Sequence, residues 1–398
     1  MSATGSAPRP SFARRRELQA LLVEMLGYPT TAAQPFQMPV ATRQWQAQDW
    51  LDASSMASTQ GVISWFLHRA EASGCPIAVL DALGRRFQGA RVLAGFAANM
   101  SLRLGREFSK RSIPMRVFKG QFLAQAAYGD ARLRNSSDID IIVPPYAVAD
   151  AAKCLIESGF RTNIAHEWFS DEQFLERFRE VPFTSVEGLT SIDFHWRLAS
   201  RWTPCAVDDA ELYDDVAANL LNIFETHVPW FSPSVLWRIQ LTHMVSSDWL
   251  GFKTWLDLAH TFDLLNAESK AHVVERCVQT RCSFPLAVAA SVLRQTFGRD
   301  TTALTRQLPA AMLQRAEASA QLCVRALLSA TERVDGADRR GLWRVSAAPP
   351  VWKSLWLRST QHDLTQYQQP PAGRTRFMLS AKAVQQRIHK FAPFSRRI

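Results

Sequence analysis

The sequence predicts an α+β protein in which a small core of strands and helices separates two helical regions. Apolar residues recur at helical intervals before residue 113 and again from residue 208 onward. Between these regions, short apolar runs alternate with helix-like runs, which indicates mixed α and β structure. The changes of pattern predict a disordered tail over 1–12, a helical region over 13–112, an α/β core over 113–207, a helical domain over 208–333, and a proline-containing arm with a basic C-terminal helix over 334–398.

The N-terminal segments differ sharply in composition. Residues 1–11 are small, polar and proline-bearing, so we expect this part of the tail to carry no chemistry. The following region repeats apolar residues at helical spacing, for example from Leu18 to Met25 and from Val92 to Met100. We expect it to form a helical cap beside the core.

The core is predicted by strands that alternate with helices. A strand leads into a helix through Lys119-Gly120, and a later pair of apolar runs is joined by the turn residues Glu187-Gly188, which is typical of a hairpin. In chain order the predicted elements are a strand over 113–118, a helix over 121–128, a polar loop over 129–137, a strand over 138–143, a helix ending before 159, a helix over 171–179, and hairpin arms over 183–186 and 190–198.

The C-terminal part is predicted to be all helical from residue 208 to residue 333. Its tryptophans are spaced irregularly, so core or interdomain packing is favoured over a platform for stacking bases; they are Trp230, Trp237, Trp249 and Trp255. Residues 374–397 mix apolar side chains with lysines and arginines. That basic helix could lie on an anionic membrane surface or dock on the body of the protein.

Composition narrows the class of protein. The 398 residues are 47% hydrophobic and 21% charged, which excludes extended disorder. The formal net charge of +10 favours acidic partners such as nucleotides, nucleic acid or anionic membrane, but scattered solvated faces explain it equally well. No apolar run is long enough to span a membrane, and the N-terminus lacks a signal-peptide pattern, so a cytoplasmic protein is expected.

The six cysteines give no sign of a metal site. They show neither a CxxC pair nor a Cys/His cluster with zinc-like spacing. We expect buried thiols, as in a reducing cytoplasm.

Two acids in the strand over 138–143 are the most informative feature of the sequence. Asp138 and Asp140 are two residues apart, so both side chains project to the same face of the strand. Adjacent carboxylates repel each other unless a cation neutralises them, and Mg²⁺ is well suited to that task. The simpler alternative is a polar sheet edge, but aspartate is disfavoured in a strand that otherwise holds isoleucine and valine.

A third acid lies in the second arm of the predicted hairpin. Alternation places Ile192, Phe194 and Trp196 on the packed face and Asp193 with His195 on the other. If this arm lies beside the strand of Asp138 and Asp140, three carboxylates converge and can hold two metal ions, with Asp193 as the candidate general base. His195 is interpreted either as a donor that orients a carboxylate or as an ordinary buried histidine.

Three segments, MRVFKGQFLAQAAYGD, RNSSDIDIIV and SIDFHWRL, resemble the uncharacterised nucleotidyltransferase family of the DNA polymerase β-like superfamily. The resemblance spans roughly residues 90–265. It implies a polymerase β-like core and transfer of a nucleoside monophosphate from a nucleoside triphosphate, with ATP expected, assisted by Mg²⁺ or Mn²⁺. Asp138, Asp140 and Asp193 match the metal-binding acids of the superfamily.

The resemblance also places the triphosphate. Lys119 and Gly120 match the glycine-led motif, where a helix N-terminus and a cation suit a phosphate. Gln121 departs from the glycine or serine that is usual at its position. The further candidates for triphosphate contact are Arg134, Ser136 and Ser137.

A helical segment over 243–263 also resembles the family. Lys253 and Asp257 lie four residues apart there, a spacing typical of a helix-stabilising pair, and Lys253 is a second candidate for nucleotide or acceptor contact.

The expected function is metal-dependent nucleotidyl transfer to an unknown acceptor, which could be a small molecule, a peptide, a protein or RNA. Two alternatives remain open at this stage. One is a non-catalytic protein that binds a nucleotide or a partner, and the other is a toxin-like enzyme that modifies RNA or protein.

Overall fold

The computed structural model describes residues 11–27, 45–136, 138–188, 190–199, 207–214, 219–247, 249 and 251–328. Nearly all of the predicted tail and the whole predicted arm with its basic helix lie outside these residues, as does Ser137. Over the described residues the protein is a mixed α and β structure with a small mixed sheet, which confirms the predicted α+β class.

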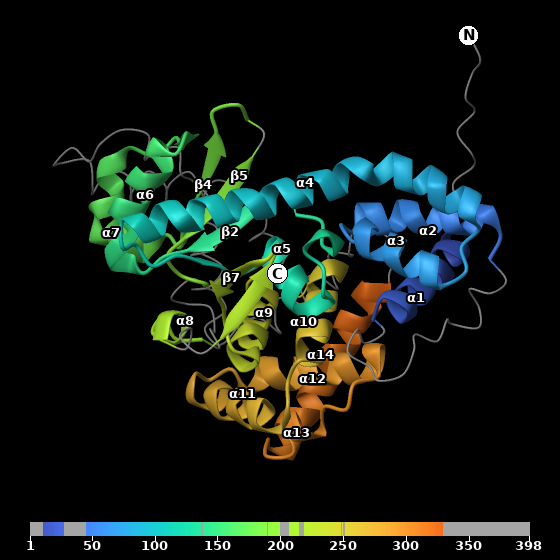
Figure 1. Cartoon of the computed structure of the whole chain (residues 1–398). Helices are drawn as coiled ribbons and strands as arrows, with labels where there is room; N and C mark the ends of the chain where they lie inside the picture. Colours follow the sequence, from blue (N-terminus) through green and yellow to red (C-terminus); the bar gives the residue numbers. More distant parts are fainter. Residues whose placement is uncertain are drawn as a thin grey trace, which may run out of the picture.

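The N-terminal region is helical, as predicted. It contains α1 (Phe12–Gly27), α2 (Ala47–Thr59), α3 (Ile63–Ala72) and α4 (Ile77–Lys110). The first three helices pack together, and α4 runs from them across the molecule to the sheet, where it contacts β2 and α6 (Figure 1). The predicted cap is therefore joined to the core by one continuous helix of 34 residues.

The central sheet has five strands in the order β1-β2-β5-β4-β3. The strands are β1 (Arg116–Val117), β2 (Asp138–Ile142), β3 (Phe160–Arg161), β4 (Glu180–Ser185) and β5 (Ser191–His195). β2 and β5 are parallel, and the other neighbours pair antiparallel. The predicted β4–β5 hairpin is confirmed, and the parallel pairing brings the strand of Asp138 and Asp140 beside the strand of Asp193.

One predicted strand is much shorter in the structure. Only Arg116 and Val117 of the expected run over 113–118 form β1. Pro114 has no N–H to donate to a sheet ladder, and Ser112 before it has a φ of 55°, so the chain enters the sheet late.

Short helices connect the strands. They are α5 (Gly120–Tyr128), α6 (Val148–Glu157) and α7 (Glu172–Arg177), with 3₁₀ turns at Ala131–Leu133, Pro145–Ala147 and His166–Ser170. Ile139, Ile141, Ile192 and Phe194 are fully buried on one face of the sheet. The alternation of β2 and β5 then leaves their aspartates on the opposite face.

The C-terminal part is not all helical, so that prediction is wrong at its start. After α8 (Glu211–Asp214), a two-stranded hairpin is formed by β6 (Leu220–Ile223) and β7 (Thr226–Pro229). Its turn holds Phe224 and Glu225 at φ values of 47° and 63°. Hairpin turns of this kind usually carry glycine or asparagine, so the sequence lacks the usual signal.

The rest of this part is helical and packs against the N-terminal helices. It consists of α9 (Pro233–Ser246), α10 (Phe252–Phe262), α11 (Ala267–Gln279), α12 (Ser283–Phe297), α13 (Thr302–Thr305) and α14 (Ala310–Leu328). The indole of Trp65 in α3 donates to the carbonyl of Leu26, and the imidazole of His260 in α10 lies 2.9 Å from the same oxygen. Helices from both ends of the described chain therefore share one core.

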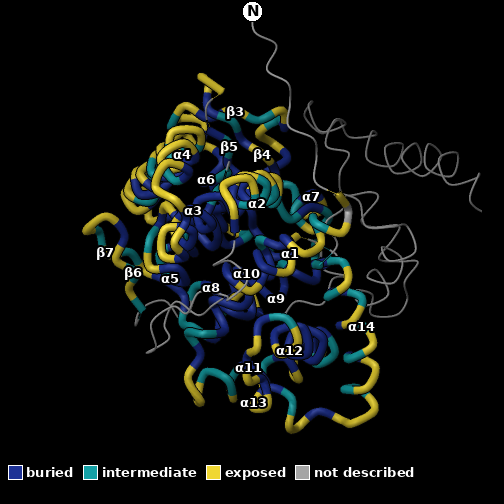
Figure 2. The backbone as a smooth tube through the Cα atoms, turned by 90° about the vertical axis from the view of Figure 1, so that its right-hand side faces the viewer, coloured by how far each residue is buried: buried dark blue, intermediate teal, exposed yellow. Residues whose placement is uncertain are grey.

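Buried residues fill the interior, and α9, α10 and α12 are almost entirely buried (Figure 2). The four tryptophans expected in the core are buried, as predicted. Five cysteines are buried free thiols, and Cys205 lies outside the described residues. Among the described helices, none is both long enough and apolar enough to cross a membrane.

Candidate active site

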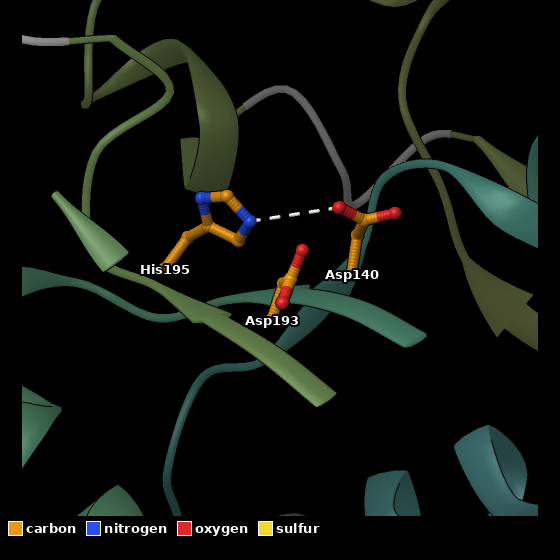
Figure 3. Close-up of side chains that lie close together, drawn as sticks. All are labelled: Asp140, Asp193 and His195. Carbon is orange, nitrogen blue, oxygen red and sulfur yellow. Dashed lines mark ion pairs between the residues drawn. The ribbon is translucent and has the colours of Figure 1, made fainter. Parts of the chain in front are cut away.

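The two predicted acidic strands meet in the sheet. In the parallel register of β2 and β5, Asp140 stands directly opposite Asp193, and His195 follows two residues later on the same face. Ligand atoms of these three residues all lie within 4.8 Å of one another. Figure 3 shows the two carboxylates and the imidazole turned toward a common space.

Asp140 is held as a carboxylate by two basic neighbours. Lys119 Nζ donates to its Oδ1 at 3.1 Å, and His195 Nε2 lies 3.5 Å from the same oxygen. Burial alone disfavours the charged form, but Lys119 and His195 outweigh it and hold the pKa of Asp140 well below its usual range. The predicted phosphate lysine is therefore in direct contact with the predicted metal ligand.

The surroundings of Asp193 shift its pKa in the opposite direction to that of Asp140. Burial first, and then the negative charges of Asp140 and Asp138, raise the pKa of Asp193 to about 6, although His195 opposes this. A carboxyl group in this position gains from any additional cation that approaches it.

Glu180 completes the surroundings of His195 and was missed in the sequence. It lies opposite His195 in the β4–β5 pairing, and its Oε2 is 2.9 Å from His195 Nδ1. Despite burial, the charge of His195 keeps the pKa of Glu180 well below its usual range. The predicted strand began at residue 183, and extending its alternation back to 180 places Glu180 on the same face as Asp193.

Asp138 is near this group but not part of it. Its Oδ1 accepts a hydrogen bond from Ser136 Oγ at 2.8 Å. The cluster of Asp140, Asp193 and His195 atoms does not include it. Its negative charge nevertheless helps to raise the pKa of Asp193, and the alternation of β2 places Asp138 on the same face as Asp140.

The predicted phosphate motif lies at the start of α5. Gly120 has a φ of 61°, a conformation that favours glycine, and an added Cβ would lie 3.8 Å from Ser136 Oγ. Lys119 is the N-cap of the helix and Gln121 is buried, with its Nε2 lacking a hydrogen-bond partner. The structure thus brings Lys119, Gly120 and Ser136 beside the acids.

The family model described as "Uncharacterised nucleotidyltransferase" matches residues 46–298, which is well over half of the chain. The chain belongs to this nucleotidyltransferase family. The match is wider than the segments that first suggested it and runs from α2 through α12, so it includes parts of both helical regions. A comparison with curated proteins and a comparison with solved structures each find no match.

In this member of the nucleotidyltransferase family, Arg134 is held inside the protein by α10. Its guanidinium donates to both carboxylate oxygens of Asp257, with Nε at 3.1 Å and Nη2 at 3.0 Å. Tyr128 OH donates to the same carboxylate at 2.7 Å. We call Tyr128, Arg134 and Asp257 the buried triad; it fixes the loop that leads into β2.

Lys253 holds the same loop by another contact. Its Nζ donates to the carbonyl of Asn135 at 3.3 Å, while Asp257, its predicted helix partner, accepts from Arg134 and Tyr128. Asn135 Oδ1 in turn accepts from the backbone N–H of Ser64 in α3. The loop that carries Ser136 is therefore tied to helices on both sides of the core.

The charges of the site influence His243 of α9, a residue that was not singled out in the sequence. Burial, and then the positive charge of Lys119, lower the pKa of His243 well below its usual range, while Asp140 opposes this. The imidazole of His243 is therefore neutral at neutral pH. The sequence offered no signal for it, because most residues of α9 are buried whatever their polarity and His243 lies 48 residues beyond the end of β5.

Proposed function

We propose that this nucleotidyltransferase family member transfers a nucleoside monophosphate from a nucleoside triphosphate, with ATP expected, to an oxygen or nitrogen of an acceptor. The observation that carries the proposal is the pairing of Asp140 with Asp193 across parallel strands, inside a cluster whose charges are incompletely balanced. Repulsion between these acids favours a bound divalent cation. The polymerase β-like core implied by the resemblance belongs to the same proposal.

The donor atoms fit a divalent metal ion. Asp140 and Asp193 provide carboxylate oxygens within a few ångströms of each other, and His195 provides a nitrogen. Asp138, on the same face of β2, is proposed as a further ligand. A bound ion of this kind neutralises phosphate charge and lowers the pKa of an attacking hydroxyl.

The residues around α5 are proposed to hold the triphosphate. Gly120 allows the close approach of a phosphate to the helix start, and Lys119 adds a positive charge there. Ser136 lies in the neighbouring loop, Ser137 follows it in the sequence, and Gln121 has an unpaired amide nitrogen. Arg134 is assigned a positioning role, because Asp257 engages its guanidinium.

Asp193 is the residue best suited to receive a proton. Its pKa of about 6 lies close to neutral pH, which suits a general base. In the proposed step a new P–O bond forms between the acceptor oxygen and the α-phosphorus, and the bond to the bridging oxygen breaks. Pyrophosphate leaves with that electron pair, and the acceptor proton passes to Asp193. Positioning and charge neutralisation supply most of the acceleration.

The test is label transfer with matched variants. Purified protein is incubated with α-labelled triphosphates, Mg²⁺ or Mn²⁺, and a lysate separated into RNA, protein and small molecules. We expect one fraction to take the label with release of pyrophosphate. Asp138→Asn and Asp140→Asn should each reduce this by about a hundredfold or more, since they remove charge stabilisation at the transition state.

Asp81→Asn is the control, because Asp81 is an exposed acid on α4. It should retain full transfer. Tight triphosphate binding without pyrophosphate release from any fraction would instead identify a non-catalytic nucleotide-binding protein. Labelled RNA whose binding weakens steeply with salt would select the RNA-modifying alternative.

A further inference from the structure

We infer that the acidic cluster is a mixed nitrogen and oxygen metal site, in which His195 is a ligand and Mn²⁺ binds in preference to Mg²⁺. The inference shares its location with the proposed function, and rests on that function only for the presence of a divalent ion. It concerns which ion the site selects and which atom selects it.

The first step is the direction of the imidazole. His195 is 3% exposed, and neither of its ring nitrogens has a hydrogen-bond partner among the described residues. That nitrogen lies 3.5 Å from Asp140 Oδ1, which is longer than a hydrogen bond. Two ligands at about 2.1 Å in adjacent octahedral positions stand about 3 Å apart, so the spacing suits two ligands of one ion. Figure 3 shows the Nε2 edge of the ring directed toward the carboxylates.

The second step is the state of the other ring nitrogen. His195 Nδ1 lies 2.9 Å from Glu180 Oε2. A carboxylate at this distance stabilises a proton on Nδ1, so Nε2 is the ring nitrogen that can give up its proton to an incoming metal ion and bind it through the lone pair. Carboxylates that orient a ligating histidine in this way recur around protein metal sites. Glu180 is therefore assigned as the positioning residue for His195.

The third step is competition with Lys119. The ammonium group lies 3.1 Å from the same Asp140 oxygen that faces His195. An incoming ion must compete with this ammonium group for the Asp140 carboxylate, which is one of the ion's proposed ligands. An ion that also gains from a nitrogen ligand competes better than one that gains from oxygen alone.

The ligand set then decides between ions. Mg²⁺ prefers oxygen ligands and loses its waters reluctantly, whereas first-row transition ions also accept imidazole nitrogen. Two carboxylates with one imidazole suit Mn²⁺, which accepts both donor types. We therefore expect the full-length protein to bind Mn²⁺ at least about tenfold more tightly than Mg²⁺.

The experiment measures binding and spectroscopy rather than turnover. Mn²⁺ is titrated into the full chain and followed by its electron paramagnetic resonance signal, with Mg²⁺ added as competitor. Bound Mn²⁺ should show coupling to a ¹⁴N nucleus, and protein labelled with ¹⁵N-histidine should shift that coupling to ¹⁵N. This labelled comparison requires no substitution, so a folding defect cannot obscure it.

Variants then assign the nitrogen. His195→Gln should abolish the coupling and raise the Mn²⁺ dissociation constant about tenfold or more, while changing that of Mg²⁺ less than about threefold. Glu180→Gln should weaken Mn²⁺ binding about tenfold through loss of orientation. His166→Gln, which replaces an exposed histidine, is the matched control and should change neither ion.

Two results overturn the inference: bound Mn²⁺ without nitrogen coupling, or equal affinities for Mn²⁺ and Mg²⁺. Either result leaves the proposed function intact if labelled nucleotide is still transferred. Conversely, nitrogen coupling without transfer to any acceptor contradicts the proposed function and retains the mixed metal site.

Discussion

The short loop that leads into β2 lies between the buried triad and the cluster of Asp140, Asp193 and His195, which we call the acidic cluster. In the buried triad, the Arg134 guanidinium faces one carboxylate, and Tyr128 adds a hydrogen bond to it. In the acidic cluster, Asp140 and Asp193 oppose each other, and the pKa of Asp193 is raised to about 6. Both clusters bury ionisable groups, but only the second is left with unbalanced negative charge.

This difference separates structural charge from functional charge. A buried pair with matched hydrogen bonds fixes a conformation and has little left to offer a ligand. A buried group of like charges destabilises the folded protein, and a bound cation removes that destabilisation. Burial of a charged group is therefore a weak indicator of a ligand-binding site. Buried charge that neighbouring groups do not fully neutralise is a stronger indicator. The following substitutions test that division, from the largest expected effect to the smallest.

Asp257→Asn should produce the largest loss of stability. It leaves the Arg134 guanidinium buried without its counter-charge, which typically costs about 3–5 kcal/mol. Urea unfolding measures the loss. Asp208→Asn is the control, since its pairing with Arg276 is exposed and should contribute less than about 1 kcal/mol. Equal losses in the two variants would remove the distinction between buried and exposed pairs.

Replacing the whole triad should recover most of that loss. The combination Tyr128→Phe, Arg134→Met and Asp257→Leu removes every polar partner together, which is often neutral or stabilising for a buried ion pair. We expect the free energy of unfolding of this triple variant to lie within about 2 kcal/mol of the wild-type value. ATP affinity, measured by calorimetry, should stay within about threefold; a much larger fall would place Arg134 at the triphosphate and break the division.

Asp193→Asn should stabilise the metal-free protein at neutral pH. Burial raises the pKa of Asp193 from its ordinary 3.8 to about 6 in the folded protein. The contribution of Asp193 to stability is therefore complete below about pH 4 and is lost as pH rises through 6. The melting temperature at pH 7.5 should rise by on the order of 2 °C, while transfer activity is lost. The melting temperature of the wild-type protein should rise by the same amount when Mn²⁺ is added. Unchanged melting between pH 5 and 7.5 in both proteins would contradict this balance.

Ser136→Ala should have the smallest effect on stability and transfer. Ser136 lies in the loop that joins the two clusters. It removes the hydroxyl that donates to Asp138, at a cost of about 0.5–1.5 kcal/mol in stability. Transfer should fall severalfold, and the affinity for Mn²⁺ should fall less than in His195→Gln, because the Asp138 carboxylate is kept and only the hydroxyl that orients it is lost. A Mn²⁺ affinity that falls as far as in His195→Gln would contradict this ranking.

The sequence predicted the features that depend on local pattern. The alternation in the segments of Asp140 and Asp193 and the turn at Glu187-Gly188 were sufficient for β2, β4 and β5. The pairing of β2 with β5 was an assumption, because local pattern does not specify which strands become neighbours. The structure supplies that pairing with its register.

The features that were missed depend on distant contacts or unusual turns. Arg134 and Asp257 are 123 residues apart, so their pairing has no local signature. The β6–β7 hairpin turns through Phe224 and Glu225 at positive φ, where glycine or asparagine would have signalled it. Glu180 was overlooked because the predicted strand began three residues too late.

The contacts around Leu26 determine which fragments of the chain can keep the packing of the core. Its carbonyl is contacted from α3 and from α10, and Asp257 of α10 neutralises Arg134 in the core. A fragment limited to residues 113–207 would contain Asp138, Asp140 and Asp193 but would lack Asp257, which leaves the Arg134 guanidinium without its counter-charge. Trimming for crystallisation or engineering should therefore retain the helices on both flanks of the sheet.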